Sequence, residues 1–132
     1  MTPAKQQALV AWIVWFAMFQ AAFIYPFFLG NGFPRGPNAE TPMGPALWLL
    51  CLIPIVVATA VRWLLIPKLR DPKRQLVAMI IGLALSEAPI LLSIFLMTDY
   101  PQNQIAVLML AVVSLIQFAP SYATPGFKNP TA

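Results

Sequence analysis

The chain has 132 residues, of which 60% are hydrophobic and only 9% are Asp, Glu, Lys or Arg, against about 25% charged residues in an ordinary soluble domain. This composition excludes a soluble globular protein. Four membrane spans of about 20 residues each account for most of the length and leave no room for a separate soluble domain. We therefore expect an all-α protein, a bundle of four transmembrane helices that forms a single membrane domain over residues 1–132.

The amino-acid types that are missing exclude several kinds of chemistry. The sequence has no His and a single Cys, Cys51, so His-ligated haem, zinc sites built on His or several Cys, Ser-His catalysis and intrachain disulfides are excluded. Cys51 lies inside an apolar run and is expected to be an inert packing residue. We expect no cofactor, no metal and no enzymatic activity.

Four apolar runs are long enough to cross the hydrocarbon core of a bilayer: Ala8–Leu29, Ala46–Ile66, Leu76–Met97 and Gln104–Ser121. All four are predicted to be helices, because a backbone in lipid must satisfy its own hydrogen bonds and these runs lack the strict alternation of barrel strands. The first run exceeds the apolar region of a secretory signal, which spans about 7–15 residues. We interpret it as a retained span.

The distribution of Lys and Arg predicts the orientation. The second connection holds Lys68, Arg70, Lys73 and Arg74, whereas the first, rich in Gly and Pro, has Arg35 with Glu40. By the positive-inside rule the second connection is cytoplasmic. Both termini are then cytoplasmic as well, so the prediction is N-in, C-in.

The net charge of +4 comes mostly from this connection. A compact basic cluster next to a membrane is typical of contact with anionic lipid headgroups, whereas nucleic-acid binding needs basic residues spread over a folded face. Arg62, near the cytoplasmic end of the second span, is interpreted as an interfacial anchor that reaches the headgroups. The expected partner is a bilayer with anionic headgroups, not nucleic acid.

Glu87 is the strongest functional candidate. It lies about 15 Å from either end of its span, at about 1.5 Å per residue, too deep for a short carboxylate to reach water. It must be protonated, paired with another group or exposed to a wet crevice. Ser86 precedes it, and Pro89 frees the carbonyl of Leu85, so polar groups gather within one helical turn.

Counting residues from the middle of each span places Gln20, Glu87 and Ser114 at similar depths. The three could form one polar layer, which Gln117 would extend toward the cytoplasm. Two interpretations stay open. The layer is either a set of hydrogen bonds that hold the helices together, which we favour, or a proton or Na⁺ site.

A stripe of small residues predicts which face of the third span packs against protein. Ala78, Gly82, Ser86 and Ser93 recur at helical spacing, which lets a neighbouring helix approach closely. Glu87 borders this stripe and should therefore face protein.

The stretch Arg70-Asp71-Pro72-Lys73-Arg74-Gln75, followed by a helix with Ala84-Leu85-Ser86-Glu87-Ala88, resembles the proteolipid subunit of rotary ATPases, where a polar cytoplasmic loop precedes a helix with a midmembrane carboxylate. That family's preceding helix carries a repeated glycine pattern, whereas Ala46–Ile66 contains no Gly. The two additional spans and Pro89 also depart from the family, so its activity is not transferred. The whole chain resembles small uncharacterised four-span proteins of the bacterial inner membrane, which implies a multi-pass inner-membrane location and no mechanism.

Together these features predict a non-enzymatic accessory or structural protein of the inner membrane, within a homo-oligomer or a larger membrane complex. The alternative is a proton or Na⁺ pathway that uses Glu87 with Ser86, Gln20 and Ser114.

Overall fold

The structure is a computed structural model that describes residues 3–30, 32 and 34–123. Within these ranges the chain is helical and contains no strand. The four α-helices are α1 (Pro3–Leu29), α2 (Pro45–Ala60), α3 (Pro72–Leu96) and α4 (Pro101–Ile116). Short turns follow two of them: the π turn η1 (Val61–Leu65) and the 3₁₀ turn η2 (Ile66–Lys68) after α2, and the 3₁₀ turn η3 (Pro120–Ala123) after α4. The expectation of an all-helical bundle is confirmed.

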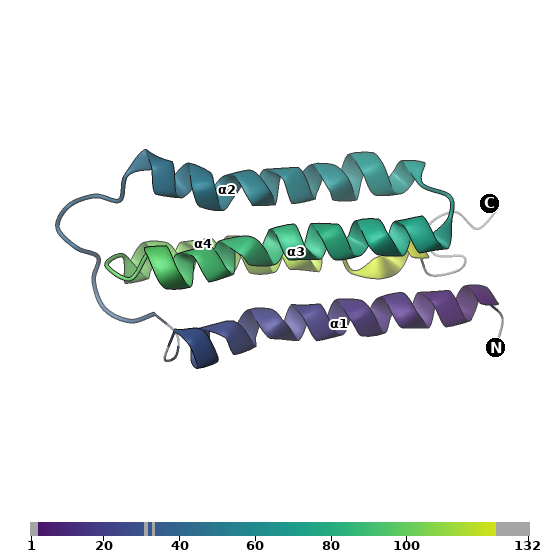
Figure 1. The fold of residues 1–132 in the computed structure, drawn as a ribbon, viewed down its shortest axis with the longest axis horizontal. Helices are drawn as coiled ribbons and strands as arrows, with labels where there is room; N and C mark the ends of the chain where they lie inside the picture. Colours follow the sequence, from purple (N-terminus) through teal and green to yellow (C-terminus); the bar gives the residue numbers. More distant parts are fainter. Residues whose placement is uncertain (1–2, 31, 33, 124–132) are drawn as a thin grey trace.

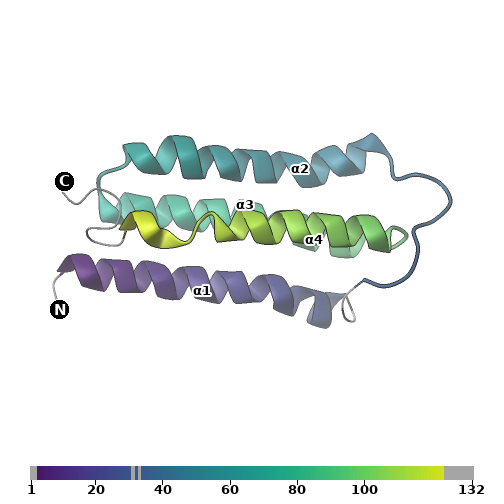
Figure 2. The same cartoon turned by 180° about the vertical axis from the view of Figure 1, so that it is seen from behind.

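α3 is the central helix of the bundle. It packs against α1, α2 and α4, and both ribbon views place α3 and α4 between α1 and α2 (Figures 1 and 2). Successive helices run in opposite directions. The start of α1, η2 and η3 therefore lie together at one end, which we call the basic end because it carries the Lys- and Arg-rich connection. The α1–α2 loop and the α3–α4 turn lie at the opposite end, the loop end.

Three helical segments are long and apolar enough to cross a membrane: Lys5–Leu29, Pro45–Lys68 and Pro72–Leu96. α4 is a shorter apolar helix. The outer faces carry large exposed apolar side chains, such as Phe28 and Val56, which are 80% and 66% exposed. Because soluble monomers rarely expose so much contiguous apolar surface, the bundle is suited to a lipid environment.

Proline sets the start of three helices. Pro45, Pro72 and Pro101 each lie in the first turn of their helix, where the missing N–H costs nothing because it would have no partner inside the helix. Asp71 caps α3, its carboxylate accepting the backbone N–H of Lys73 at 3.1 Å. α3 therefore begins at Pro72, four residues before the predicted start of the third span at Leu76.

The second span ends in a widened turn. α2 passes into the π turn η1, in which the backbone N–H of Ile66 bonds to the carbonyl of Val61. Pro67 explains this geometry, because it has no N–H to give to the carbonyl of Trp63 and its ring crowds that carbonyl. The extra residue in the turn rotates the residues that follow it relative to the faces of α2.

The predicted extent of the fourth span, to Ser121, was too long. α4 ends at Ile116, and a 3₁₀ turn begins at Pro120. Pro120 cannot donate to the carbonyl of Ile116, and it disfavours helical geometry at Ala119. The chain therefore leaves the α-helix at Gln117, and η3 follows it toward the basic end.

The stripe of small residues on α3 faces protein, as predicted. Ala78 is 4% exposed, Ser86 and Ser93 are fully buried, and Gly82 is buried as well. The ring of Phe118, which follows the end of α4, occupies the space where a Cβ of Gly82 would lie. The absence of a side chain at Gly82 thus makes room for the largest fully buried side chain of the core.

At the loop end, Asn38 ties the α1–α2 loop to α4. Its side-chain oxygen accepts the backbone N–H groups of Gln102 and Asn103 at 2.9 and 3.4 Å. These are first-turn amides that have no partner within the helix. The neighbouring Ala39 donates its N–H to the carbonyl of Asp99 at 2.9 Å, so the long loop is fixed to the α3–α4 turn.

Candidate functional site

Glu87 is buried in α3, with only 7% of its surface exposed. It lies about 14 Å from the end of α3 at Leu96, at about 1.5 Å per residue. The side chain of Tyr25, on α1, interacts with its carboxyl group. Oε1 of Glu87 has no hydrogen-bond partner among the described residues, and it is the only buried side-chain nitrogen or oxygen there of which this is true. An unpaired buried acceptor of this kind calls for an explanation, such as a proton, an ion or a water.

The predicted polar layer does not form as one unit. Gln20 is exposed on α1, beside a shallow groove that it lines with Trp12, Phe16 and other residues. Among the described residues its amide has no hydrogen-bond partner. Gln20 is therefore not part of a buried polar layer with Glu87.

Ser86 and Ser114 do meet, at the interface of α3 and α4. Their hydroxyl oxygens lie 2.6 Å apart, and both residues are buried. The Ser86 hydroxyl also lies 3.0 Å from the carbonyl of Gly82, to which it donates. Since Ser86 has only one hydroxyl proton, the Ser114 hydroxyl is then the donor to Ser86.

Gln117 continues this chain of hydrogen bonds toward the basic end. Its Nε2 donates to Ser114 Oγ at 3.1 Å and to Thr59 Oγ1, on α2, at 3.2 Å. Its Oε1 accepts the indole N–H of Trp63 at 2.9 Å. Because an indole N–H can only donate, this contact fixes the orientation of the amide. Every hydrogen-bonding position on the Gln117 amide nitrogen is thus used.

Arg62 completes the cluster. It is only 8% exposed, and its Nε donates to the backbone carbonyl of Gln117 at 2.6 Å. Its guanidinium lies 4.1 Å from the ring centre of Trp63, a cation–π contact. A cation beside the last carbonyls of a helix also interacts favourably with the helix dipole. We refer to Thr59, Arg62, Trp63, Ser86, Ser114 and Gln117 as the Gln117 cluster.

The structure gives Arg62 a protein partner that the sequence did not reveal; its contact with lipid headgroups stays a prediction. The four other basic residues that were predicted to contact headgroups are exposed at the basic end. These are Lys68, Arg70, Lys73 and Arg74.

Three residues that contact Glu87 or belong to the Gln117 cluster were not predicted from the sequence: Tyr25, Thr59 and Trp63. Tyr and Trp are common near membrane interfaces, so Tyr25 and Trp63 gave no distinct signal. Thr59 bonds to the carbonyl of Ile55 within its own helix at 2.9 Å, an ordinary role for Thr. A polar residue one turn before Arg62 is the only signal that would have pointed to Thr59.

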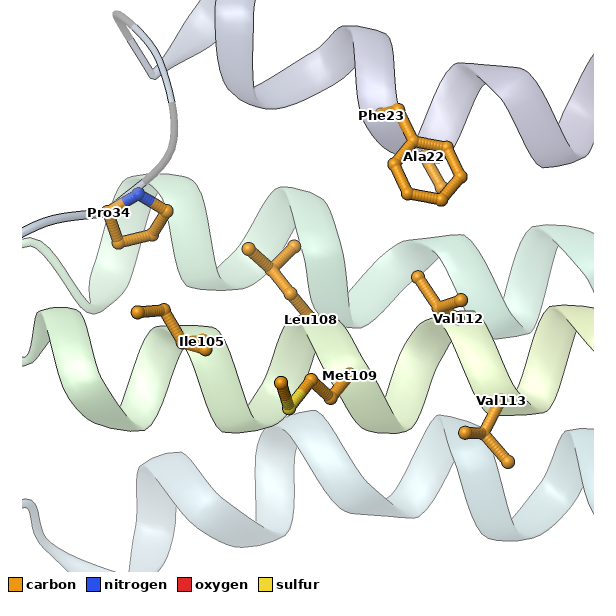
Figure 3. A pocket seen from close by; sticks show the side chains of 8 residues that line it. All are labelled: Ala22, Phe23, Pro34, Ile105, Leu108, Met109, Val112 and Val113. Atoms are coloured by element: carbon orange, nitrogen blue, oxygen red, sulfur yellow. The ribbon is translucent and has the colours of Figure 1, made fainter.

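A groove of about 630 Å³ opens between α1 and α4 (Figure 3). Its lining is entirely apolar and comes from both helices and the loop: Ala22, Phe23, Pro34, Ile105, Leu108, Met109, Val112 and Val113. Without a polar group it offers a surface for hydrocarbon rather than a site for chemistry.

No set of three or more His, Cys, Asp or Glu residues that could hold a metal ion occurs in the described part of the chain. The polar groups that converge near Glu87 in the described part of the chain are hydroxyls, an amide and a guanidinium, which hold helices together through hydrogen bonds. No protein-family model matches the chain, and no match to it was found among curated protein sequences or solved structures.

Proposed function

We propose that the protein is a multi-pass protein of the bacterial inner membrane that crosses the bilayer four times, with both termini in the cytoplasm. The three long apolar helices support this proposal. So does the position of Lys68, Arg70, Lys73 and Arg74 at one end of the bundle, because cytoplasmic connections carry an excess of Lys and Arg. α4, about 24 Å long at about 1.5 Å per residue, is the fourth span, and η3 extends it toward the basic end.

Labelling of introduced cysteines tests this topology. In a Cys51→Ala background, a membrane-impermeant thiol reagent applied from outside should modify a cysteine at position 40, which is exposed in the α1–α2 loop. It should spare one at position 70, which is exposed in the basic connection. The reverse pattern would overturn the orientation, and labelling of both in sealed cells would overturn the number of spans.

Within the membrane the protein acts as a non-enzymatic accessory or structural component, in a homo-oligomer or a larger complex. The observation that carries this proposal is the Gln117 cluster, which joins α2, α3 and α4 through donors and acceptors that satisfy one another. A hydrogen-bond network of this kind rigidifies a bundle.

A second function, a proton or Na⁺ pathway through Glu87, is favoured by its buried oxygen Oε1, which has no partner among the described residues. A buried ionisable residue inside a membrane marks an ion or proton route in many proteins. Ser86, next to Glu87 in sequence, connects to the basic end through Ser114 and Gln117.

One experiment separates the two functions. Purified protein is reconstituted into vesicles, and proton and Na⁺ flux are measured under an imposed gradient. The structural proposal expects no flux above that of empty vesicles. Flux that disappears in Glu87→Gln, but persists in Glu40→Gln as the matched control in the loop, would overturn it and establish the ion pathway.

A further inference from the structure

A second groove, of about 360 Å³, lies at the basic end of the bundle between η1 and α3. Most of its lining side chains are apolar, and two cationic side chains lie at one end. The charged end is formed by Lys73 and Arg74. The walls are formed by Val61, Leu65, Leu69, Val77, Ala78 and Ile81. From Arg74 to Ile81 the groove follows α3 for about 10 Å, at about 1.5 Å per residue. It is therefore apolar along the membrane and positive at the predicted membrane surface.

The charged end is held in place by the connection that precedes it. The backbone N–H of Leu69 bonds to the carbonyl of Ile66 at 3.1 Å, and the side-chain amide of Gln75 donates to the carbonyl of Leu69 at 2.8 Å. Asp71 directs its carboxylate to the backbone N–H of Lys73. The turn is thus ordered by its own hydrogen bonds, and the exposed side chains of Lys73 and Arg74 project from the rigid first turn of α3.

We propose that this groove binds one anionic phospholipid, with an acyl chain along Val77 and Ile81 and the phosphate on Lys73 and Arg74. The inference rests on the proposed membrane location. Charge complementarity selects the occupant: an Arg guanidinium and a Lys ammonium are phosphate-binding groups, and apolar walls bury hydrocarbon. A free phosphate would leave the walls uncovered, and an apolar helix would leave the cations without a partner.

The test measures thermal unfolding of the purified full chain in a non-ionic detergent with added dioleoyl phosphatidylglycerol or dioleoyl phosphatidylcholine. Phosphatidylglycerol should raise the unfolding temperature of the wild type, and phosphatidylcholine at the same concentration should raise it much less, because a ligand that binds only the folded state stabilises it. The difference between the lipids should be lost in Lys73→Gln/Arg74→Gln. It should persist in Lys68→Gln/Arg70→Gln, which removes the same charge from the same connection but from side chains outside the groove.

A second pair of variants tests the apolar walls without changing charge. Val77→Trp fills the groove and should abolish the selective effect of phosphatidylglycerol, whereas Ile80→Trp, on an exposed position of α3 outside the groove, should retain it. Equal loss in both double variants, an equal response to the two lipids, or the same stabilisation by inorganic phosphate would each overturn the proposal. Release of the protein from membranes by alkaline carbonate would instead overturn the membrane proposal itself, so the two failures are distinguishable.

Discussion

Trp63 donates its indole N–H to Oε1 of Gln117 at 2.9 Å, and this one contact determines how three helices are joined. With Oε1 facing Trp63, Nε2 faces Thr59 on α2 and Ser114 on α4, and Ser114 in turn bonds to Ser86 on α3. The amide of Gln117 lies where α4 ends, just beyond its last residue, Ile116. The residue that follows the end of α4 thus connects α2, α3 and α4 through side-chain hydrogen bonds.

We expect Gln117→Ala to lower the free energy of unfolding in detergent by about 1–3 kcal/mol. It removes the three side-chain hydrogen bonds of Gln117, each contributing about 0.6 kcal/mol on average between helices in a membrane, and leaves the indole N–H of Trp63 without its partner. Chemical or thermal unfolding followed by circular dichroism measures the loss. Gln20→Ala is the control, because Gln20 is exposed; equal losses in the two variants would mean that the cluster does not hold the bundle together.

The sequence predicts the helices of this bundle well, because an apolar run of this length has few alternatives to a helix in a membrane. It predicts their ends less well. The fourth span was extended through Pro120, although a proline at that position removes the bond to Ile116 and ends the helix. The first helix begins at Pro3, before the apolar run that starts at Ala8, because polar residues can lengthen a helix without contributing to hydropathy.

The candidate site was predicted only in part, for a geometric reason. Counting residues from the middle of a span gives the depth of a side chain but not its direction around the helix. Gln20, Glu87 and Ser114 were placed at similar depth, but Ser114 meets Ser86, the neighbour of Glu87, and Gln20 is exposed on α1. The spacing of Thr59, Arg62 and Trp63 puts them on one helix face, but nothing in the sequence shows that Gln117 packs against that face.

Gly82→Ala should lower stability, although Gly→Ala in an unconstrained helix raises it by about 0.5–1 kcal/mol. The added methyl group would overlap the buried ring of Phe118, and overpacking of this kind costs about 1–3 kcal/mol. Thermal unfolding in detergent measures the change. The double variant Gly82→Ala/Phe118→Leu should show less destabilisation than the sum of the two single variants; strict additivity, or a gain in stability from Gly82→Ala alone, would contradict the contact.

A double-mutant cycle should detect the bond between Ser86 and Ser114. We expect a coupling energy of about 0.6–1.7 kcal/mol from Ser86→Ala and Ser114→Ala, because each variant removes the partner of the other. The matched control is the pair Ser86→Ala and Ser93→Ala. Ser93 is equally buried on α3 but bonds to the carbonyl of Ile90 in its own helix, so its effect should add to that of Ser86. Coupling of the same size in both cycles would point to a general loosening of α3.

Asn38→Ala should weaken the loop end without disturbing the rest of the bundle. It leaves the backbone N–H groups of Gln102 and Asn103 without the oxygen that accepts them, and the loss of a helix cap costs about 0.5–2 kcal/mol. Hydrogen exchange should become faster at these two amides and at Ala39, while amides in the middle of α3 keep their protection. Unchanged exchange at Gln102 would show that the loop does not cap α4 in the membrane.

The last prediction concerns Glu87, where the two proposed functions differ. In a structural bundle the carboxyl group is protonated and held beside Tyr25, so Glu87→Gln, which keeps a carbonyl acceptor and N–H donors in nearly the same shape, should leave folding and assembly unchanged. A hydrophobic carbodiimide provides the independent measurement, since it reacts with protonated carboxyl groups that it can reach from the lipid or from a crevice. Because Glu87 is only 7% exposed, we expect no modification at this residue by mass spectrometry of the intact protein. Modification of Glu87 that is absent in Glu87→Gln would show that the unpaired Oε1 is reached from outside the bundle, as an ion or proton pathway requires, and would count against the structural role.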